Sequence, residues 1–110
     1  MKKYAVKITS PAQRQLEEIV LYITTELQAP GAALRLLDEL ESKIASLSDF
    51  PDRIALTEEE PWRSRGIHKM LVKNYLVYFW IDDVSQKVQV TAIIYAKRDQ
   101  RQQLSQMVIE

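Results

Sequence analysis

Positively charged and aromatic side chains gather in the second half of this 110-residue chain. Cations beside aromatic rings can hold phosphate groups and stack bases, as sites for single-stranded nucleic acid do. The same set could bind an acidic protein segment, or could consist of strand-end charges that keep a sheet soluble. The cations are Arg63, Arg65, Lys69, Lys73, Lys97, Arg98 and Arg101, and the aromatic residues among them are Tyr75, Tyr78, Trp80 and Tyr95.

The distribution of charge limits the first of these interpretations. Residues 1–60 carry 7 Lys or Arg against 11 Asp or Glu, and residues 61–110 carry 8 against 4, so the net charge is zero. A protein that binds nucleic acid without sequence preference is usually basic throughout, because phosphate contacts dominate its affinity. A local basic face remains open as an interpretation, whereas a general one is excluded.

Other kinds of chemical site find little support. The chain has no cysteine and a single histidine, His68, so a thiolate site or a histidine-based metal cluster is excluded, and we expect no cofactor. The acidic run at 58–60 lacks the alternating ligand spacing of a calcium loop. Two glycines are too few for a glycine-rich phosphate loop, and no serine lies in a nucleophile elbow. We therefore expect His68 to be structural rather than a general base.

Length and composition indicate one domain over residues 1–110. A hydrophobic fraction of 46% and a charged fraction of 27% are typical of a globular protein with a real core. The absence of cysteine favours a reducing cytoplasm. The start "MKKYAVKITS" lacks the apolar segment of a signal peptide, so we expect neither secretion nor a membrane span.

Two helices are predicted in the first half. Ser10 is expected as the N-cap, with Pro11 at the first helical position and Gln13 completing a capping box. Apolar residues then recur every three or four positions to about residue 28, where "APGA" interrupts the pattern, and again to about residue 48. Two long helices joined by a short turn should form an antiparallel hairpin.

Four strands are predicted at residues 3–9, 67–72, 75–81 and 87–96. The third is apolar on both faces, which indicates a central strand, and in the turn before it Asn74 can accept positive φ. Strict alternation in the last strand would place Val88, Val90, Ala92 and Ile94 on one face.

The loop before the second strand carries Trp62, which we expect to be a packing anchor, and the tail could form a short helix with Leu104 and Val108 packed down. The order predicts an α+β fold, β-α-α-β-β-β, with a mostly antiparallel sheet, the helical hairpin on one face and a possible short C-terminal helix. The other face of the sheet is expected to stay open.

Several stretches together resemble the RelE/ParE superfamily of toxins from type II toxin–antitoxin systems, over nearly the full length of the chain. The resemblance rests on "YAVKITSPAQRQLEEIVLYI", "LLDELESKIASLSDFPDR", "PWRSRGIHKMLVKNYLVYFWID" and "IIYAKRDQRQQL". It implies the fold predicted above and a small cytoplasmic bacterial toxin, of the kind linked to growth inhibition and plasmid stabilization. It also implies an antitoxin, encoded beside the toxin, whose extended segment wraps and silences it, giving a toxin–antitoxin hetero-oligomer.

Members of the superfamily differ in their target. RelE-like toxins cut mRNA in the ribosomal A site with lysines and arginines on the open sheet face, while ParE-like toxins are thought to poison DNA gyrase. By position, Arg98 in "YAKRD" matches the arginine that ends the last strand of the RelE-like nucleases, with Lys97 beside it. If the chain is a nuclease, this resemblance implies catalytic roles for Arg98, Lys69 and Lys73.

The sequence departs from the nuclease pattern in three ways. Leu76 stands where an arginine is expected in the meander, no tyrosine follows Arg98, and the strongly basic character is missing. Cleavage by a ribose hydroxyl requires positioning and charge stabilisation at the phosphate, which these losses weaken. We therefore expect a ParE-like gyrase poison, with a ribosome-dependent mRNA endonuclease as the alternative. The residues expected to contact the target or the antitoxin are Arg65, Tyr78, Trp80, Tyr95, Lys97 and Arg98.

Overall fold

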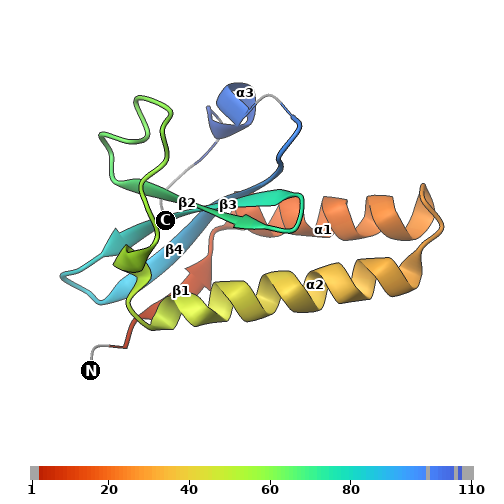
Figure 1. Cartoon of the computed structure of the whole chain (residues 1–110), viewed down its shortest axis with the longest axis horizontal. Coiled ribbons are helices and arrows are strands. Elements are labelled where there is room, and N and C mark those ends of the chain that lie inside the picture. Colours follow the sequence, from red (N-terminus) through yellow and green to blue (C-terminus); the bar gives the residue numbers. More distant parts are fainter. Residues whose placement is uncertain (1–2, 99, 106, 108–110) are drawn as a thin grey trace.

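The elements follow one another as the sequence predicts. The computed structural model describes residues 3–98, 100–105 and 107. In chain order these form β1 (Ala5–Ile8), α1 (Ser10–Thr25), α2 (Pro30–Ala45), β2 (Ile67–Val72), β3 (Tyr75–Asp82), β4 (Lys87–Tyr95) and α3 (Gln100–Leu104) (Figure 1). Two short 3-10 turns, η1 (Ser46–Ser48) and η2 (Pro51–Arg53), follow α2. This order confirms the predicted α+β fold.

The four strands form one mixed sheet in the order β1-β4-β3-β2. β2, β3 and β4 are antiparallel neighbours, whereas β1 pairs in parallel with β4, so that Val6 lies opposite Val88. β3 is an inner strand and is buried on both faces, as its apolar sequence predicted.

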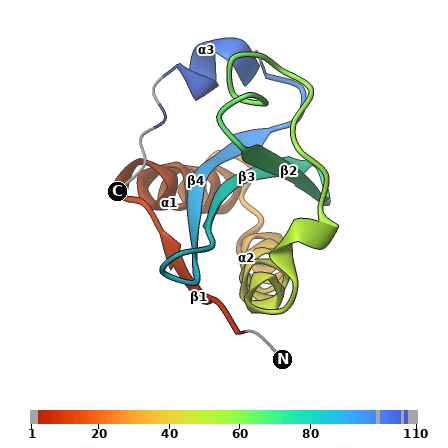
Figure 2. The ribbon, with the colours of Figure 1, turned by 90° about the vertical axis from the view of Figure 1, so that its left-hand side faces the viewer.

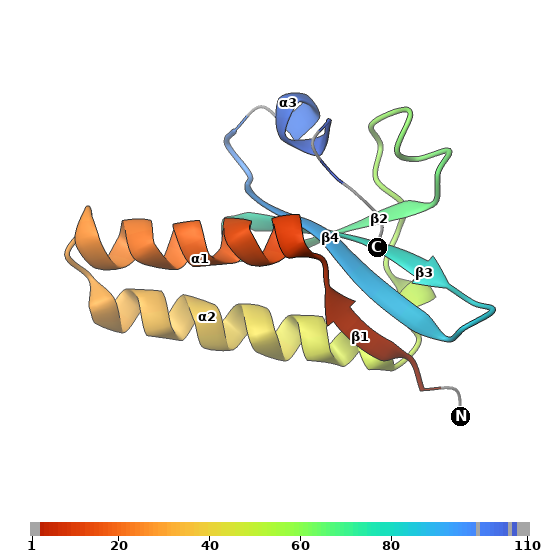
Figure 3. The same cartoon turned by 180° about the vertical axis from the view of Figure 1, so that it is seen from behind.

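One face of the sheet is covered by the antiparallel pair α1 and α2 (Figures 1 and 3). The joined ends of these two helices extend past the β2–β3 turn. The apolar stripes of both helices pack here against side chains from β2, β3 and β4. This larger core includes Leu16, Leu40, Val77, Phe79 and Val90. Burial of such side chains stabilises each by about 1.5–3 kcal/mol, which holds the hairpin on the sheet.

The opposite face is not open, contrary to the prediction. The loop before β2 and helix α3 lie across it (Figure 2). Trp62 from the loop and Leu104 from α3 form a second, smaller core with Tyr78 and Ile94 of the sheet. Trp62 is therefore a packing anchor, as expected, while Val108 lies outside the described residues. The prediction failed because the sequence indicated that Trp62 packs somewhere but not that it packs on this face of the sheet.

A β-bulge in β4 overturns the predicted strict alternation. Tyr78 lies opposite Ala92 but Phe79 lies opposite Val90, so Thr91 is an extra residue in the ladder. Val90 consequently belongs to the larger core, and Ala92 and Ile94 to the smaller one. The bulge lets one strand supply apolar side chains to both layers.

Two local details also differ from the sequence predictions. Thr9, not Ser10, is the N-cap of α1, and its side chain makes no capping hydrogen bond. In the β2–β3 turn Lys73 adopts the positive φ of 56° that was expected at Asn74. Neither change moves the elements that the residues connect.

Candidate functional site

A large groove lies between the overhanging ends of the helices and the end of the sheet. This helix–sheet groove has a volume of about 1260 Å³. Its walls come from α1, the first two thirds of α2, the β2–β3 turn, the end of β4 and Gln103 of α3. The groove forms because the joined ends of α1 and α2 extend past the β2–β3 turn (Figure 1).

The floor of the groove is apolar, and part of it faces solvent. Ile19, Ile23 and Leu36 line it, while Tyr22 and Leu27 are 54% and 56% exposed. Exposed apolar surface edged by polar residues is a common feature of interaction sites and ligand-binding grooves. The sequence predicted the apolar stripe along the helices. It did not indicate that the last part of this stripe extends past the sheet and remains exposed.

Cations and tyrosines stand at the sheet end of the groove. Lys73, Tyr75, Tyr95 and Arg98 all line it. The rings of Tyr75 and Tyr95 are tilted against each other with centroids 5.4 Å apart. Burial, followed by the nearby hydroxyls of Tyr95 and Tyr22, raises the pKa of Tyr75, so the Tyr75 hydroxyl is protonated at physiological pH.

Backbone hydrogen bonds fix this end of the groove. Ala96 N–H donates to the Asn74 carbonyl at 2.9 Å, which joins the end of β4 to the β2–β3 turn, and Arg98 N–H donates to the Tyr95 carbonyl at 3.0 Å. Arg98, like Lys73, lines the groove. Lys97 is exposed but does not line the groove. The charged residues that α1 and α2 contribute to the lining are Glu18, Arg35, Asp38 and Glu39.

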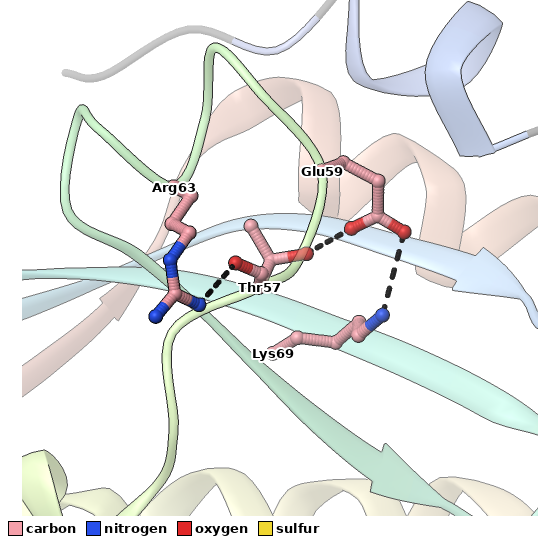
Figure 4. Close-up of polar contacts among 4 residues, drawn as sticks. All are labelled: Thr57, Glu59, Arg63 and Lys69. Carbon is pink, nitrogen blue, oxygen red and sulfur yellow. Dashed lines mark hydrogen bonds and ion pairs between the residues drawn. The ribbon is translucent and has the colours of Figure 1, made fainter.

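Lys69 belongs to a different group of residues, on the second face of the sheet. Its Nζ lies 3.4 Å from Glu59 Oε2, and the Thr57 hydroxyl donates to the other oxygen of the same carboxylate (Figure 4). Arg63 donates to the Thr57 carbonyl at 3.3 Å. This Glu59 cluster, made by Thr57, Glu59, Arg63 and Lys69, fastens the loop to β2.

The carboxylate of Glu59 is held ionised by its surroundings. Burial acts to raise its pKa, but the hydrogen bond from Thr57, its own backbone N–H and the charge of Lys69 outweigh burial and leave the pKa below its ordinary value. The positive charge of Lys69 is thus paired with a carboxylate of the same chain.

The remaining predicted contact residues lie around this cluster. Tyr78 is 0% exposed, and its hydroxyl has no hydrogen-bond partner among the described residues. Burial, followed by the charge of Glu59, raises its pKa far above the ordinary value. Trp80 is half-buried beneath Gly66, and Arg65 is exposed on the loop. The predicted residues therefore divide between two regions instead of forming one site.

His68 makes contacts that suit a structural role. Its Nδ1 is 2.6 Å from the Ile54 carbonyl, and its ring stacks on Phe79 with centroids 5.1 Å apart. Among the described residues, no group of three or more His, Asp or Glu side chains could hold a metal ion. In the same part of the chain, no helix is long and apolar enough to cross a membrane.

Residues 6–100 match the model of one protein family, described as the ParE toxin of the type II toxin–antitoxin system parDE. The chain belongs to this family. A comparison with curated proteins gave no match.

Solved toxin structures share the fold of this family member. The chromosomal ParDE system of P. aeruginosa matches with a TM-score of 0.70 and 17% identity, covering 86% of this chain and 98% of that one. The RelBE2 toxin–antitoxin complex of Mycobacterium tuberculosis matches at 0.59 and 20%, covering 84% and 98%. An arginine double mutant of the E. coli toxin RelE in the free state matches at 0.62 and 13%, covering 92% of each chain.

Proposed function

We propose that the chain is the toxin of a type II toxin–antitoxin module, that it arrests growth by acting on DNA gyrase in the cytoplasm, and that a cognate antitoxin neutralises it. The family match over residues 6–100 is the observation that carries this proposal. The similar ParDE and RelBE2 structures come from toxin–antitoxin systems, which supports an antitoxin as the partner.

The helix–sheet groove is the place where we expect the antitoxin to bind. Its exposed apolar floor, with Tyr22 and Leu27, suits the apolar face of an amphipathic helix. Lys73 and Arg98 at one side of the groove would pair with acidic side chains of that helix, and Tyr95 would pack between them. Basic side chains on its other edge would meet Asp38 and Glu39.

An mRNA endonuclease is the less favoured function. It would need Lys69, Lys73 and Arg98 at one phosphate group, because cleavage depends on positioned charge. Lys73 and Arg98 line the groove, whereas Lys69 is paired with Glu59 and does not line it. With Lys69 already neutralised, the gyrase mechanism, which requires binding and no chemistry by this chain, is the better supported of the two.

Expression of the chain alone in a bacterial host tests the proposal. We expect filamentation and a DNA-damage response, and we expect the product of the neighbouring reading frame to restore growth. Purified protein should also inhibit supercoiling by gyrase. Translation arrest without DNA damage, with codon-phased mRNA cuts that disappear in Arg98→Ala, would instead establish the endonuclease.

A further inference from the structure

The carboxylate of Glu59 leaves a neighbouring hydrogen-bond donor without a partner. The Thr57 hydroxyl donates to one oxygen of this carboxylate, and Lys69 Nζ lies 3.4 Å from the other (Figure 4). The Tyr78 hydroxyl is buried and has no hydrogen-bond partner among the described residues. A buried hydroxyl without a partner is unfavourable, so the chain itself uses this set of donors incompletely.

Tyr78 lies beside the Glu59 cluster. It stands directly opposite Lys69 in the β2–β3 ladder, so both side chains are on the same face of the sheet. Lys69 N–H donates to the Ala55 carbonyl at 3.2 Å and therefore points away from β3. In an antiparallel pair of this non-hydrogen-bonded kind the side chains come closest together, with Cα atoms about 4.5 Å apart. The negative charge of Glu59 also acts on the Tyr78 hydroxyl, which shows that the two groups are near each other.

The surroundings of the Glu59 carboxylate favour an anion. Burial acts to raise the pKa of Glu59, but the Thr57 hydrogen bond, its own backbone N–H and the charge of Lys69 keep that pKa below its ordinary value. An ammonium group and hydroxyl groups are the kind of donors that bind oxyanions through charge-assisted hydrogen bonds. A carboxylate offers only two oxygens to them, whereas a free or terminal phosphate group offers three or more and could also accept from Tyr78.

The loop keeps other attachments if the Glu59 side chain turns toward solvent. Thr57 N–H donates to the Ile67 carbonyl at 2.8 Å, Ile67 N–H donates to the Trp62 carbonyl at 3.1 Å, and Trp62 is buried in the smaller core. The side chains of Glu59 and Lys69 are 18% and 24% exposed, so the ion pair is in contact with solvent. Rotation of Glu59 would thus open the position of its carboxylate and leave the donors in place.

The number of donors limits the kind of phosphate. A phosphodiester within a nucleic-acid strand has only two unesterified oxygens, as a carboxylate has, and would again leave one donor unpaired. Its two ester branches would also both need a way out, although Thr57 and Tyr78 are fully buried. A free phosphate, or the terminal phosphate of a monoester, meets neither difficulty.

We propose that Thr57, Lys69 and Tyr78 form a binding site for a phosphate group, either free or as a terminal monoester, and that Glu59 is a built-in competitor for this site. None of these four residues lines the helix–sheet groove, so the site is separate from the place where we expect the antitoxin. The proposal does not depend on the proposed toxin function, because the purified chain is sufficient to test it.

Calorimetric titration of the purified chain with inorganic phosphate measures this binding. Glu59→Ala removes the competitor, and we expect the affinity for phosphate to rise about tenfold over the wild type, because a site that is open in only a fraction of the molecules binds more weakly by that fraction. Glu58→Ala removes an exposed carboxylate one residue away and is the matched control, which should bind phosphate as the wild type does.

A second substitution in the Glu59→Ala chain identifies the donors. Tyr78→Phe removes one hydrogen bond to a charged group, so we expect the affinity for phosphate to fall about tenfold while the melting temperature holds or rises. Tyr75→Phe, at a half-buried tyrosine of the same strand, should leave the affinity unchanged. The melting temperature of every variant shows whether it is folded, and Glu59→Gln, which removes the charge but keeps the length of the side chain, replaces Glu59→Ala if that variant is not.

Equal phosphate affinity in the wild type and the folded Glu59 variant, or an equal gain in Glu58→Ala, would overturn the proposal. So would an affinity that Tyr78→Phe does not change. A single-stranded oligodeoxynucleotide without terminal phosphates that competes as well as inorganic phosphate would also overturn it, since the site would then accept diesters. Titration with adenosine 5′-monophosphate separates the two supporting results: tighter binding than inorganic phosphate identifies a monoester as the ligand, and weaker binding identifies the free anion.

Discussion

The helix–sheet groove and the Glu59 cluster both contain cations from the same part of the sequence, but they differ in whether those cations are paired within the chain. In the groove, Lys73, Tyr95 and Arg98 stand beside an exposed apolar floor. On the second face, Lys69 is paired with Glu59 and Tyr78 is covered by the loop. A cation is available to a partner only where the chain brings no carboxylate of its own to it, and that depends on tertiary structure.

The largest effect is expected when the face of the sheet under the loop before β2 is uncovered. Trp62→Ala deletes the main side chain that attaches the loop to the smaller core, and we expect it to lower the free energy of unfolding by about 3 kcal/mol. Urea denaturation measures this loss. Antitoxin affinity should survive, since Trp62 does not line the groove. A loss below about 1 kcal/mol would mean that the loop rests on the sheet without forming a core.

A charge placed in the groove should produce the opposite pattern, with weaker binding and unchanged stability. Leu27→Glu introduces a carboxylate into the exposed apolar floor, and we expect antitoxin affinity to fall about 30-fold while the free energy of unfolding changes by about 0.5 kcal/mol or less. Leu21→Glu, at an exposed leucine of α1 outside the groove, is the control. Calorimetric titration with the antitoxin measures the affinity of each variant. Equal affinities for Leu27→Glu and Leu21→Glu would contradict binding of the antitoxin in the groove.

Glu59→Gln tests the ionic part of the second face. The amide can still accept the Thr57 hydrogen bond but cannot pair with the charge of Lys69, so we expect a loss of about 1 kcal/mol at neutral pH. Because folding lowers the pKa of Glu59 from 4.5, its stabilisation is complete above about pH 4.5 and is lost as the pH falls through the lower folded value. Stability measured from pH 7 to pH 3 should therefore fall less in the variant, and parallel curves would contradict the assignment.

The smallest expected effect concerns the Tyr78 hydroxyl. Tyr78→Phe removes a buried polar group that has no partner among the described residues, so we expect a gain of about 0.5–1 kcal/mol in the free energy of unfolding. Tyr75→Phe, at a half-buried ring beside the groove, should change stability by less than that. Destabilisation by Tyr78→Phe would show that the hydroxyl does find a partner in solution.

The sequence was sufficient for the elements and their order because periodicity, proline and turn residues are local signals. The stripe through Leu16 and Ile23 indicated a helix and its buried side, and the run from Tyr75 to Ile81 indicated a strand buried on both faces. The resemblance and the periodicity led to the same β-α-α-β-β-β order, which the structure confirms.

The grouping of side chains in space could not be predicted in the same way. The bulge at Thr91 moves Ala92 and Ile94 to the opposite face from Val90, and no local residue preference announces it. The pairing of Lys69 with Glu59 requires the loop to fold back across the sheet, which an acidic, proline-bounded sequence does not suggest. One cationic cluster in the sequence therefore became two regions in the structure.

The parallel pairing of β1 with β4 bears on when the toxin can first become active. Residues 5–8 pair with residues 87–90, so β1 cannot join the sheet until residues 87–90 have been synthesised. The end of β4, with Tyr95, and Arg98 just beyond it are made later still. Until residues 87–98 have been synthesised, the chain therefore lacks both the closed sheet and the cationic end of the groove, so the toxin surface is incomplete.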